Sequence, residues 1–158
     1  MAIATTLKNY LDNQQVRYDT VRHAQSATAL ESAHAADVPD HQVAKAVVLA
    51  DDQGYVVGVL PSNRQIDLHR VKNALGRDLD LVPEDSLGGI FGDCALGAVP
   101  ALADAYGVAG IWDEHFENVS DVYLEAGDHE NLVHLAGDDF RRLMAGAPHS
   151  RIAIDRAD

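Results

Sequence analysis

Lys45 is the residue whose position most demands a chemical explanation. It stands where the run Ala46–Ala50 begins, and such a run of small and branched apolar residues is typical of a strand covered on both faces. An ammonium group in such a place loses hydration unless it binds a partner. The sequence leaves two interpretations open. Lys45 holds a polar or anionic ligand, or it marks a strand edge and extends its ammonium into water.

The other reactive side chains form no known catalytic pattern. The sequence contains no G-x-S-x-G elbow, no Walker-type P-loop, no H-E-x-x-H motif and no G-x-G-x-x-G motif. Cys94 has no identifiable base beside it, so we interpret it as a small buried thiol. We expect neither a metal site nor a cofactor, because the histidines are scattered over positions 23, 34, 41, 69, 115, 129, 134 and 149.

The element that positions Lys45 is a predicted β-hairpin. Ala44–Ala50 and Tyr55–Leu60 are two runs rich in β-branched residues, and the polar segment 51–54 between them ends in a glycine. Neither run alternates cleanly between apolar and polar residues, which indicates strands packed on both sides. The sequence therefore places Lys45 on a central strand.

The remaining periodicities predict a mixed α+β fold. We expect helices over residues 3–15, 29–36, 66–75, 83–91 and 140–144, and further strands over 16–21, 79–82, 108–113, 122–127, 132–135 and 152–154. Ser26 or Thr28 is expected to cap the second helix, Gly76 to end the third, and Asp138 and Asp139 to cap the last. We see no repeat or linker, so we expect one domain over residues 1–158.

Composition limits the class of protein. The net charge of −13 disfavours a nucleic-acid partner at first sight, because phosphate binding depends on lysine and arginine. Lysine occurs only at positions 8, 45 and 72, and aspartate outnumbers glutamate about three to one, so the charge is also consistent with adaptation to high salt. No apolar run approaches the roughly 18 residues of a membrane span, and we expect a cytoplasmic protein without a membrane partner.

Several segments together resemble the YbaK/prolyl-tRNA-synthetase-associated-domain family. They are the lysine-bearing strand 44–49 with Val21–His23 before it, the second hairpin strand running into Leu60–Pro61, the helix start at 65–68, the strand before Asp113, and the closing segments 122–127, 132–135 and 139–140. The resemblance covers residues 16–145. It implies a mixed, partly barrel-like sheet flanked by helices.

The resemblance also implies an activity. Such proteins are aminoacyl-tRNA deacylases that act in trans and cleave the ester between a wrong amino acid and the terminal adenosine of a tRNA. The position that matches the family's substrate-orienting lysine is Lys45, and His23 and Thr28 are expected to line the site. In the mechanism that the resemblance implies, water attacks with help from the tRNA's own ribose hydroxyl. The implied partners are tRNA and an aminoacyl-tRNA synthetase.

The sequence departs from the family pattern at one loop. Backbone amides of a Gly-x-x-x-Pro loop bind the substrate carbonyl in the family, and aligning on Pro100 places Leu96 at the glycine position, with Gly97 one place later. A leucine obstructs the close backbone approach that glycine allows. Ala98 and Val99 would line a small apolar pocket, which suits a small amino acid such as alanine.

The sequence leaves two further points open. Arg64, Arg70, Lys72 and Arg77 form the densest basic stretch, which is either a tRNA-binding surface or the solvated face of a helix. The Leu96 departure and the acidic composition favour a rival function, a non-catalytic binding module that recognises an aminoacyl-adenosine-like ligand or a protein partner. A small-molecule hydrolase unrelated to tRNA is a third alternative.

Overall fold

The computed structural model describes residues 3–86, 89–94 and 98–155. Its central feature is the antiparallel hairpin of β2 (Val43–Asp51) and β3 (Gly54–Pro61), in register from the pair Ala44–Pro61 to the pair Asp51–Gly54. Gly54 has a φ of 129°, a value that side chains disfavour, so the glycine makes the tight turn possible. The hairpin predicted around Lys45 is therefore confirmed.

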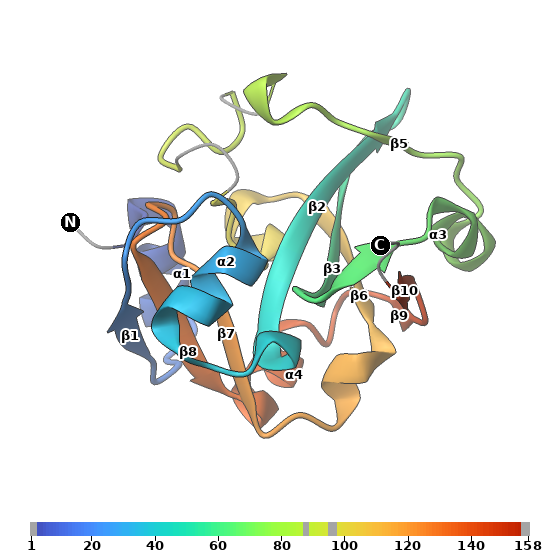
Figure 1. Ribbon diagram of the computed structural model, residues 1–158. Helices are drawn as coiled ribbons and strands as arrows, with labels where there is room; N and C mark the ends of the chain where they lie inside the picture. The colour runs from blue at the N-terminus through green and yellow to red at the C-terminus, as the bar shows by residue number, and fades with distance from the viewer. Residues whose placement is uncertain (1–2, 87–88, 95–97, 156–158) are drawn as a thin grey trace.

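The hairpin is the middle of a mixed sheet of eight described strands (Figure 1). The strand order is β1-β8-β7-β2-β3-β6-β9, and β5 pairs with β2 off this path. The β2–β7, β3–β6 and β6–β9 pairs are parallel, whereas the other pairs are antiparallel. The bounds are β1 (Asp19–Arg22), β5 (Asp80–Leu81), β6 (Ala109–Asp113), β7 (Asp121–Glu125), β8 (Asn131–Ala136) and β9 (His149–Ser150). A second sheet pairs β4 (Arg64–Ile66) with β10 (Ala153–Asp155).

β2 keeps β3 as its neighbour along its whole length but changes its neighbour on the other side. Val43 and Ala44 pair with β7, whereas Leu49 and Ala50 pair with β5. Between these two contacts, no strand in the described part of the chain pairs with residues 45–47 on that side. The sheet therefore has a local opening beside Lys45.

Four α-helices in the described residues cover the two faces of the sheet (Figure 1). α2 (Ala29–Ala36) packs its alanines on Val43 and Leu132, and α3 (Leu68–Leu75) packs on Leu49 and Ile111. α1 (Thr5–Asn13) and α4 (Gly137–Leu143) contribute to the main core, which takes in the alternate residues of β2, β3, β7 and β8. None of the helices in these described segments is long and apolar enough to span a membrane.

The expected mixed α+β architecture with a mixed sheet and flanking helices is confirmed, with local corrections. Ile66 belongs to β4, where it pairs with Ala153 of β10. The α3 helix starts only at Leu68, because the carboxylate of Asp67 caps it by accepting hydrogen bonds from the backbone of His69 and Arg70. Within 83–91 the described helix is the 3₁₀ turn Glu84–Ser86. Ala136 is the N-cap residue of α4, and Asp138 and Asp139 lie in its first turn. β9 was not predicted.

Asp113, at the end of β6, binds the backbone of two other parts of the chain, the turn at His115 and the segment 152–153. It is 4% exposed, and its carboxylate accepts hydrogen bonds from the backbone N–H groups of Ile152 at 2.8 Å, Ala153 at 2.9 Å and His115 at 3.0 Å. A carboxylate can accept these three bonds because both of its oxygens are acceptors and, when ionised, it has no hydrogen to donate. Asp113 therefore holds the C-terminal segment, which carries β10, against β6.

We expect Asp113→Ala to lower the free energy of unfolding by about 2–4 kcal/mol, because it leaves buried N–H groups without acceptors. Urea-induced unfolding followed by circular dichroism measures the loss. Asp85→Ala is the matched control, because Asp85 is exposed and should change stability by less than about 0.5 kcal/mol. Equal stability of the two variants would contradict the role given to Asp113.

His134 links three neighbouring strands on the surface of the sheet. Its Nδ1 lies 2.8 Å from Asp19 of β1, its Nε2 lies 2.8 Å from Asp121 of β7, and its ring stacks on Tyr123 with centroids 4.6 Å apart. Only the protonated imidazole can donate to both carboxylates. Burial lowers the pKa of His134, but the hydrogen bonds to Asp121 and Asp19 outweigh it and raise the pKa above its usual 6.5.

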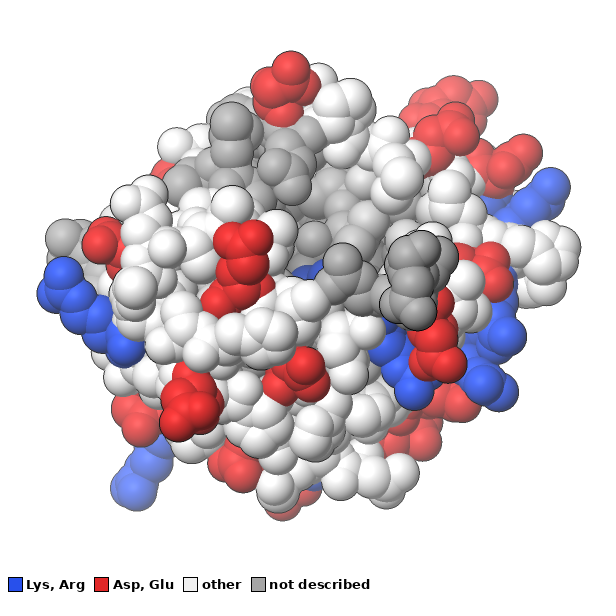
Figure 2. All heavy atoms as spheres, viewed as in Figure 1, with Lys and Arg blue, Asp and Glu red and all other residues white. Residues whose placement is uncertain are grey.

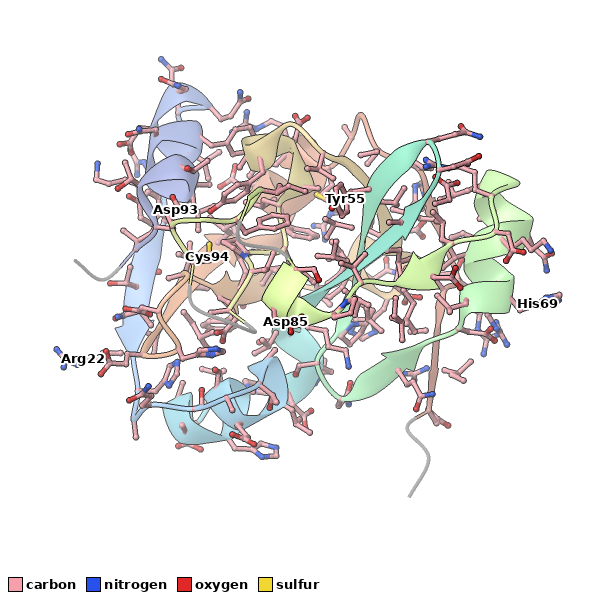
Figure 3. All side chains as sticks on the ribbon, turned by 90° about the horizontal axis from the view of Figure 1, so that it is seen from above. Arg22, Tyr55, His69, Asp85, Asp93 and Cys94 are labelled. Carbon is pink, nitrogen blue, oxygen red and sulfur yellow. The ribbon has the colours of Figure 1, made fainter. Side chains whose placement is uncertain are left out.

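A raised folded-state pKa gives a stability contribution that is complete below the unfolded pKa and is lost as the pH rises through the folded value. We therefore expect wild type to be more stable than His134→Gln near pH 5.5, by at most about 1 kcal/mol because the pair is partly exposed, and the difference to shrink above about pH 8. Thermal unfolding at both pH values measures this. His69→Gln is the control, because His69 projects from α3 (Figure 3) and is exposed. A difference that grows with pH would contradict the assignment.

Candidate functional site

A cavity of about 230 Å³ lies at the opening beside β2. Four parts of the chain form its walls: the start of α2, the middle of β2, the segment that follows residue 97, and the end of β7. The lining residues are Ala27, Thr28, Ala29, Lys45, Ala46, Val47, Val99 and Glu125. Most of this lining consists of small or branched apolar side chains, with two oppositely charged groups among them.

Lys45 reaches the cavity because of its register on β2. It shares a face of the strand with Val43 and Val47, since side chains alternate along a strand. Val43 belongs to the apolar cluster under α2, and Val47 packs against the cluster under α3, so Lys45 lies between the two clusters. The side chain is half-buried and lines the cavity. β2 has strands on both sides, and Lys45 occupies the interval between β7 and β5 on one of them.

Glu125 enters the same cavity from β7. The parallel pair Val43–Tyr123 sets the register of β2 against β7, and Lys45 and Glu125 each stand two residues further along their strands, on the same face. Glu125 is 2% exposed. Its Oε2 lies 3.3 Å from Nδ1 of His129, and within the described residues neither carboxylate oxygen accepts a hydrogen bond of normal geometry.

Burial raises the pKa of Glu125, and this effect is opposed in part by the Ser32 hydroxyl and by the imidazoles of His129 and His23. Because the charged form of a carboxylate is the one that burial disfavours, Glu125 is held more easily as the neutral acid than an ordinary glutamate. A cation placed beside it would favour the carboxylate.

The turn between β7 and β8 fixes the position of His129 over Glu125. The Asp128 carboxylate accepts hydrogen bonds from the backbone of Glu130 and Asn131, each at 3.0 Å, and from the Asn131 side chain at 2.8 Å. His129 has a φ of 60°, a left-handed conformation that this network holds in place. The carbonyls of His129 and Glu130 accept hydrogen bonds from the backbone of Ser26 and His23, which ties the turn to the loop before α2.

That loop contains the predicted residues His23, Ser26 and Thr28. Thr28 is the N-cap of α2, where its hydroxyl accepts a hydrogen bond from the backbone of Glu31 at 3.1 Å, and it also lines the cavity. Ser26 contacts the Ser32 hydroxyl at 2.6 Å and does not act as the cap. His23 is 7% exposed and its Nδ1 lies 2.7 Å from the Ala24 carbonyl, behind the cavity wall beside Glu125.

The predicted carbonyl-binding loop is described only in part. Leu96 and Gly97 lie outside the described residues. Ala98 and Pro100 are buried, and Val99 lines the cavity together with residues of α2 and β2. Through Val99 this segment reaches the same cavity as Lys45 and adds an apolar side chain to its lining.

The predicted basic residues each lie beside an aspartate. Arg64 of β4 lies 3.7 Å from Asp155, Arg70 of α3 lies 3.3 Å from Asp67, and Lys72 of α3 lies 3.8 Å from Asp78. Arg77 forms a two-pronged pair with Asp51, whose pKa falls to about 2 through this hydrogen bonding. Figure 2 shows a group of basic side chains on the side of the molecule where α3 lies, with acidic side chains among them and over the rest of the face.

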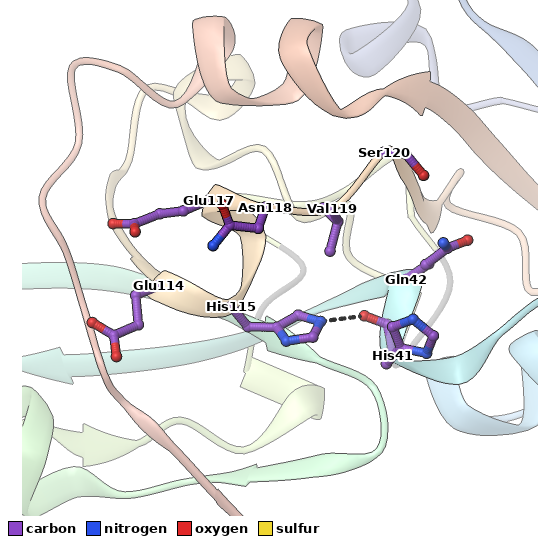
Figure 4. Close-up of a pocket in the computed structure, with 8 residues that line it drawn as sticks. All are labelled: His41, Gln42, Glu114, His115, Glu117, Asn118, Val119 and Ser120. Atoms are coloured by element: carbon purple, nitrogen blue, oxygen red, sulfur yellow. Dashed lines mark hydrogen bonds between the residues drawn. The ribbon is translucent and has the colours of Figure 1, made fainter.

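A larger groove of about 660 Å³ lies beside His41 and Gln42, the residues directly before β2 (Figure 4). The groove is lined by His41, Gln42, Glu114, His115, Glu117, Asn118, Val119 and Ser120. The ring nitrogen Nε2 of His115 lies 2.9 Å from the carbonyl oxygen of His41. Within the described part of the chain, no group of three or more histidine, cysteine, aspartate or glutamate residues has the arrangement of a metal site. The described lining of this groove contains no lysine beside a buried acid, as the Lys45 cavity does, and we therefore take the Lys45 cavity as the candidate site.

Cys94 lies apart from this pair. It sits with Asp93 on the loop near α1 (Figure 3), and its Sγ lies 3.2 Å from the Tyr106 hydroxyl, which in turn donates to Asp93 at 3.0 Å. Burial raises the pKa of the thiol to about 11. A thiol with this pKa is almost entirely protonated near neutral pH, which fits a packing role.

Glu125 is the site residue that sequence reasoning missed. The signal was present, because Glu125 interrupts the apolar run Val122–Ala126 in the way that Lys45 interrupts the apolar run of β2. The same argument from the cost of burying a charge applies to both residues. What the sequence did not show was that the two strands are neighbours.

The family to which this fold and site belong follows from a sequence comparison. The model of the aminoacyl-tRNA editing domain family matches residues 23–143, which include every described residue of the cavity. The chain therefore belongs to the aminoacyl-tRNA editing domain family, as its resemblance to the YbaK group predicted. No curated protein gives a significant sequence match.

Solved structures share the fold at low sequence identity. The hypothetical protein APE2540 superposes with a TM-score of 0.82 at 16% identity, over 94% of this chain and 99% of that one. A proposed trans-editing enzyme for prolyl-tRNA synthetase gives 0.77 at 19% identity, over 96% of each chain. A proposed signal transduction protein from Marinobacter aquaeolei VT8 gives 0.76 at 22% identity, over 95% of this chain and 30% of that one.

We expect Thr28→Ala to lower the free energy of unfolding by about 1 kcal/mol, because α2 loses its N-cap hydrogen bond. Thr28→Ser keeps the capping hydroxyl and should stay within about 0.5 kcal/mol of wild type. Urea-induced unfolding of the three proteins measures the difference. A Thr28→Ala variant as stable as wild type would show that the cap does not support this wall of the cavity.

Proposed function

We propose that this protein is an aminoacyl-tRNA deacylase that acts in trans on tRNAs carrying a wrong, small amino acid. The observation that carries the proposal is Lys45, a half-buried lysine that lines a small, mainly apolar cavity in a chain of the aminoacyl-tRNA editing domain family. A synthetase pocket separates amino acids that differ by one methylene by only about 1–3 kcal/mol, so a second, size-limited site is needed. The lining of alanine and valine side chains fits that purpose.

In the proposed reaction, Lys45 holds a phosphate or ribose oxygen at the 3′ end of the tRNA. Water adds to the ester carbonyl, the C–O bond to the ribose breaks, and the products are the free amino acid and a tRNA with its terminal hydroxyl restored. The released proton goes to solvent, and the neighbouring ribose hydroxyl assists the attack. The protein contributes by position and electrostatics, with the segment before Pro100 at the carbonyl.

The rival function is a binding module of the same fold, which holds an aminoacyl-adenosine-like ligand or a protein partner without cleaving it. The specific observation in its favour is that Arg64, Arg70 and Lys72 lie beside aspartates, which reduces the positive charge they can offer to tRNA phosphates. Release of amino acid separates the two functions directly.

We expect the protein to release a small amino acid from at least one member of a panel of mischarged tRNAs. Lys45→Ala should reduce kcat/KM for that tRNA by roughly 10- to 100-fold, the effect of losing a charged hydrogen bond of about 1.5–3 kcal/mol. The assay follows labelled amino acid released from tRNA, at low and at high salt.

Lys8→Ala is the matched control for this assay. Lys8 pairs with Asp12 on the exposed face of α1 and does not line the cavity, so its loss should leave kcat/KM within about twofold of wild type. Release that survives Lys45→Ala would remove Lys45 from the mechanism. Absence of release from every tRNA would favour the binding module, and activity highest at low salt would contradict the high-salt interpretation of the acidic composition.

A further inference from the structure

Glu125 is a buried acid whose carboxylate oxygens accept no hydrogen bond of normal geometry from the described residues, so the contacts of the fold do not offset the cost of its burial. The residue is 2% exposed, and within the described residues both oxygens lack a hydrogen bond of normal geometry. The Oε2 atom has His129 Nδ1 at 3.3 Å. An acid in this state costs free energy relative to an apolar residue of similar size. A ligand that supplies the missing donors would offset that cost.

The groups around Glu125 indicate the sign of such a ligand. Ser32 and the imidazoles of His23 and His129 face the carboxylate, and Asp128 adds a negative charge nearby that disfavours its ionisation. Asp128 itself is occupied by three hydrogen bonds within its own turn. Glu125 is therefore the acidic side chain on the cavity wall that remains available for a donor, and a cationic donor fits it best.

The cavity limits the shape of the ligand as well as its charge. Lys45 stands on β2 and Glu125 on β7, so a ligand between them meets a cationic and an anionic group. The remaining walls are alanine, valine and threonine side chains. The volume of about 230 Å³ equals that of seven or eight water molecules at about 30 Å³ each, which accommodates a small aminoacyl group.

We propose that Glu125 binds the α-ammonium group of the aminoacyl ester and so makes the site selective for substrates with a free amino group. The inference rests on the proposed deacylase function and adds to it the recognition of the amino end. Because both oxygens are shielded from solvent, binding includes a rotation of the Glu125 side chain toward the ligand. With Lys45 on the phosphate or ribose and Glu125 on the ammonium, the ester carbonyl is held between two charged contacts.

The test combines a change in the protein with a change in the substrate. Wild type and Glu125→Gln are assayed on alanyl-tRNA and on N-acetylalanyl-tRNA, which lacks the cationic amine, with the spontaneous hydrolysis of each ester subtracted. Glu130→Gln is the control, because it makes the same chemical change on the same hairpin away from the cavity lining. Thermal unfolding and circular dichroism verify that each variant is folded.

We expect wild type to hydrolyse the free-amine ester roughly tenfold or more faster than the acetylated ester. Glu125→Gln should lose roughly tenfold on alanyl-tRNA and no more than about twofold on N-acetylalanyl-tRNA, whereas Glu130→Gln should match wild type on both. Equal losses on the two substrates would overturn the inference, because Glu125 would then serve the chemical step or the fold. Equal wild-type rates on the two substrates would also overturn it, without depending on any variant.

A binding measurement separates this inference from the proposed function. The probes are 3′-deoxy-3′-(alanylamino)adenosine, whose amide linkage resists hydrolysis, and its N-acetyl derivative, titrated by calorimetry. We expect the free amine to bind roughly tenfold more tightly to wild type and the preference to disappear in Glu125→Gln. If no tRNA is hydrolysed but this preference is found, the deacylase function fails and the ammonium site stands. If hydrolysis occurs without the preference, the inference fails alone.

Discussion

The pairing of β2 is the constraint on which the rest of the structure depends. β3 pairs with it along its whole length, but its other side belongs first to β7 and then to β5. Where one neighbour ends and the next begins, the backbone of residues 45–47 borders the cavity. The position of α2 on one side and of the segment 98–100 on the other then completes the walls. A continuous neighbour along β2 would close the opening and bury Lys45 without access to a ligand.

The site holds two ionisable side chains in one small cavity, where their removal from water costs free energy. Lys45 and Glu125 stand on the same face of the sheet, within a lining that otherwise offers few polar groups. Charges in such surroundings interact more strongly with a bound ligand than exposed charges do, because less water screens them. Burying charged groups in the cavity lowers the stability of the fold, whereas other charged side chains stabilise it. Asp113 accepts hydrogen bonds from three backbone N–H groups, and His134 joins three strands. Charged side chains therefore stabilise the fold at Asp113 and His134, whereas in the cavity they remain available to a ligand at a cost in stability.

The net negative charge of the chain and the proposed tRNA substrate oppose each other electrostatically. A net charge of −13 repels phosphates over long distances at low ionic strength, and the neighbouring aspartates weaken the pull of the few basic groups near α3. High salt would screen the repulsion more than it weakens contacts inside a partly buried cavity. Recognition would then depend on the end of the tRNA, where Lys45 and the cavity act at short range.

The sequence by itself determined the hairpin around Lys45, α2 with its cap at Thr28, and the end of α3 at Gly76, because these features follow from local periodicity, turn residues and capping. It also singled out Lys45, since a charge in an apolar strand is visible without knowing the neighbours. Only the tertiary structure decided that Glu125 joins Lys45. Their meeting depends on the parallel pairing of β2 with β7, two strands far apart in the chain, and no local pattern specifies which strands become neighbours or in which register.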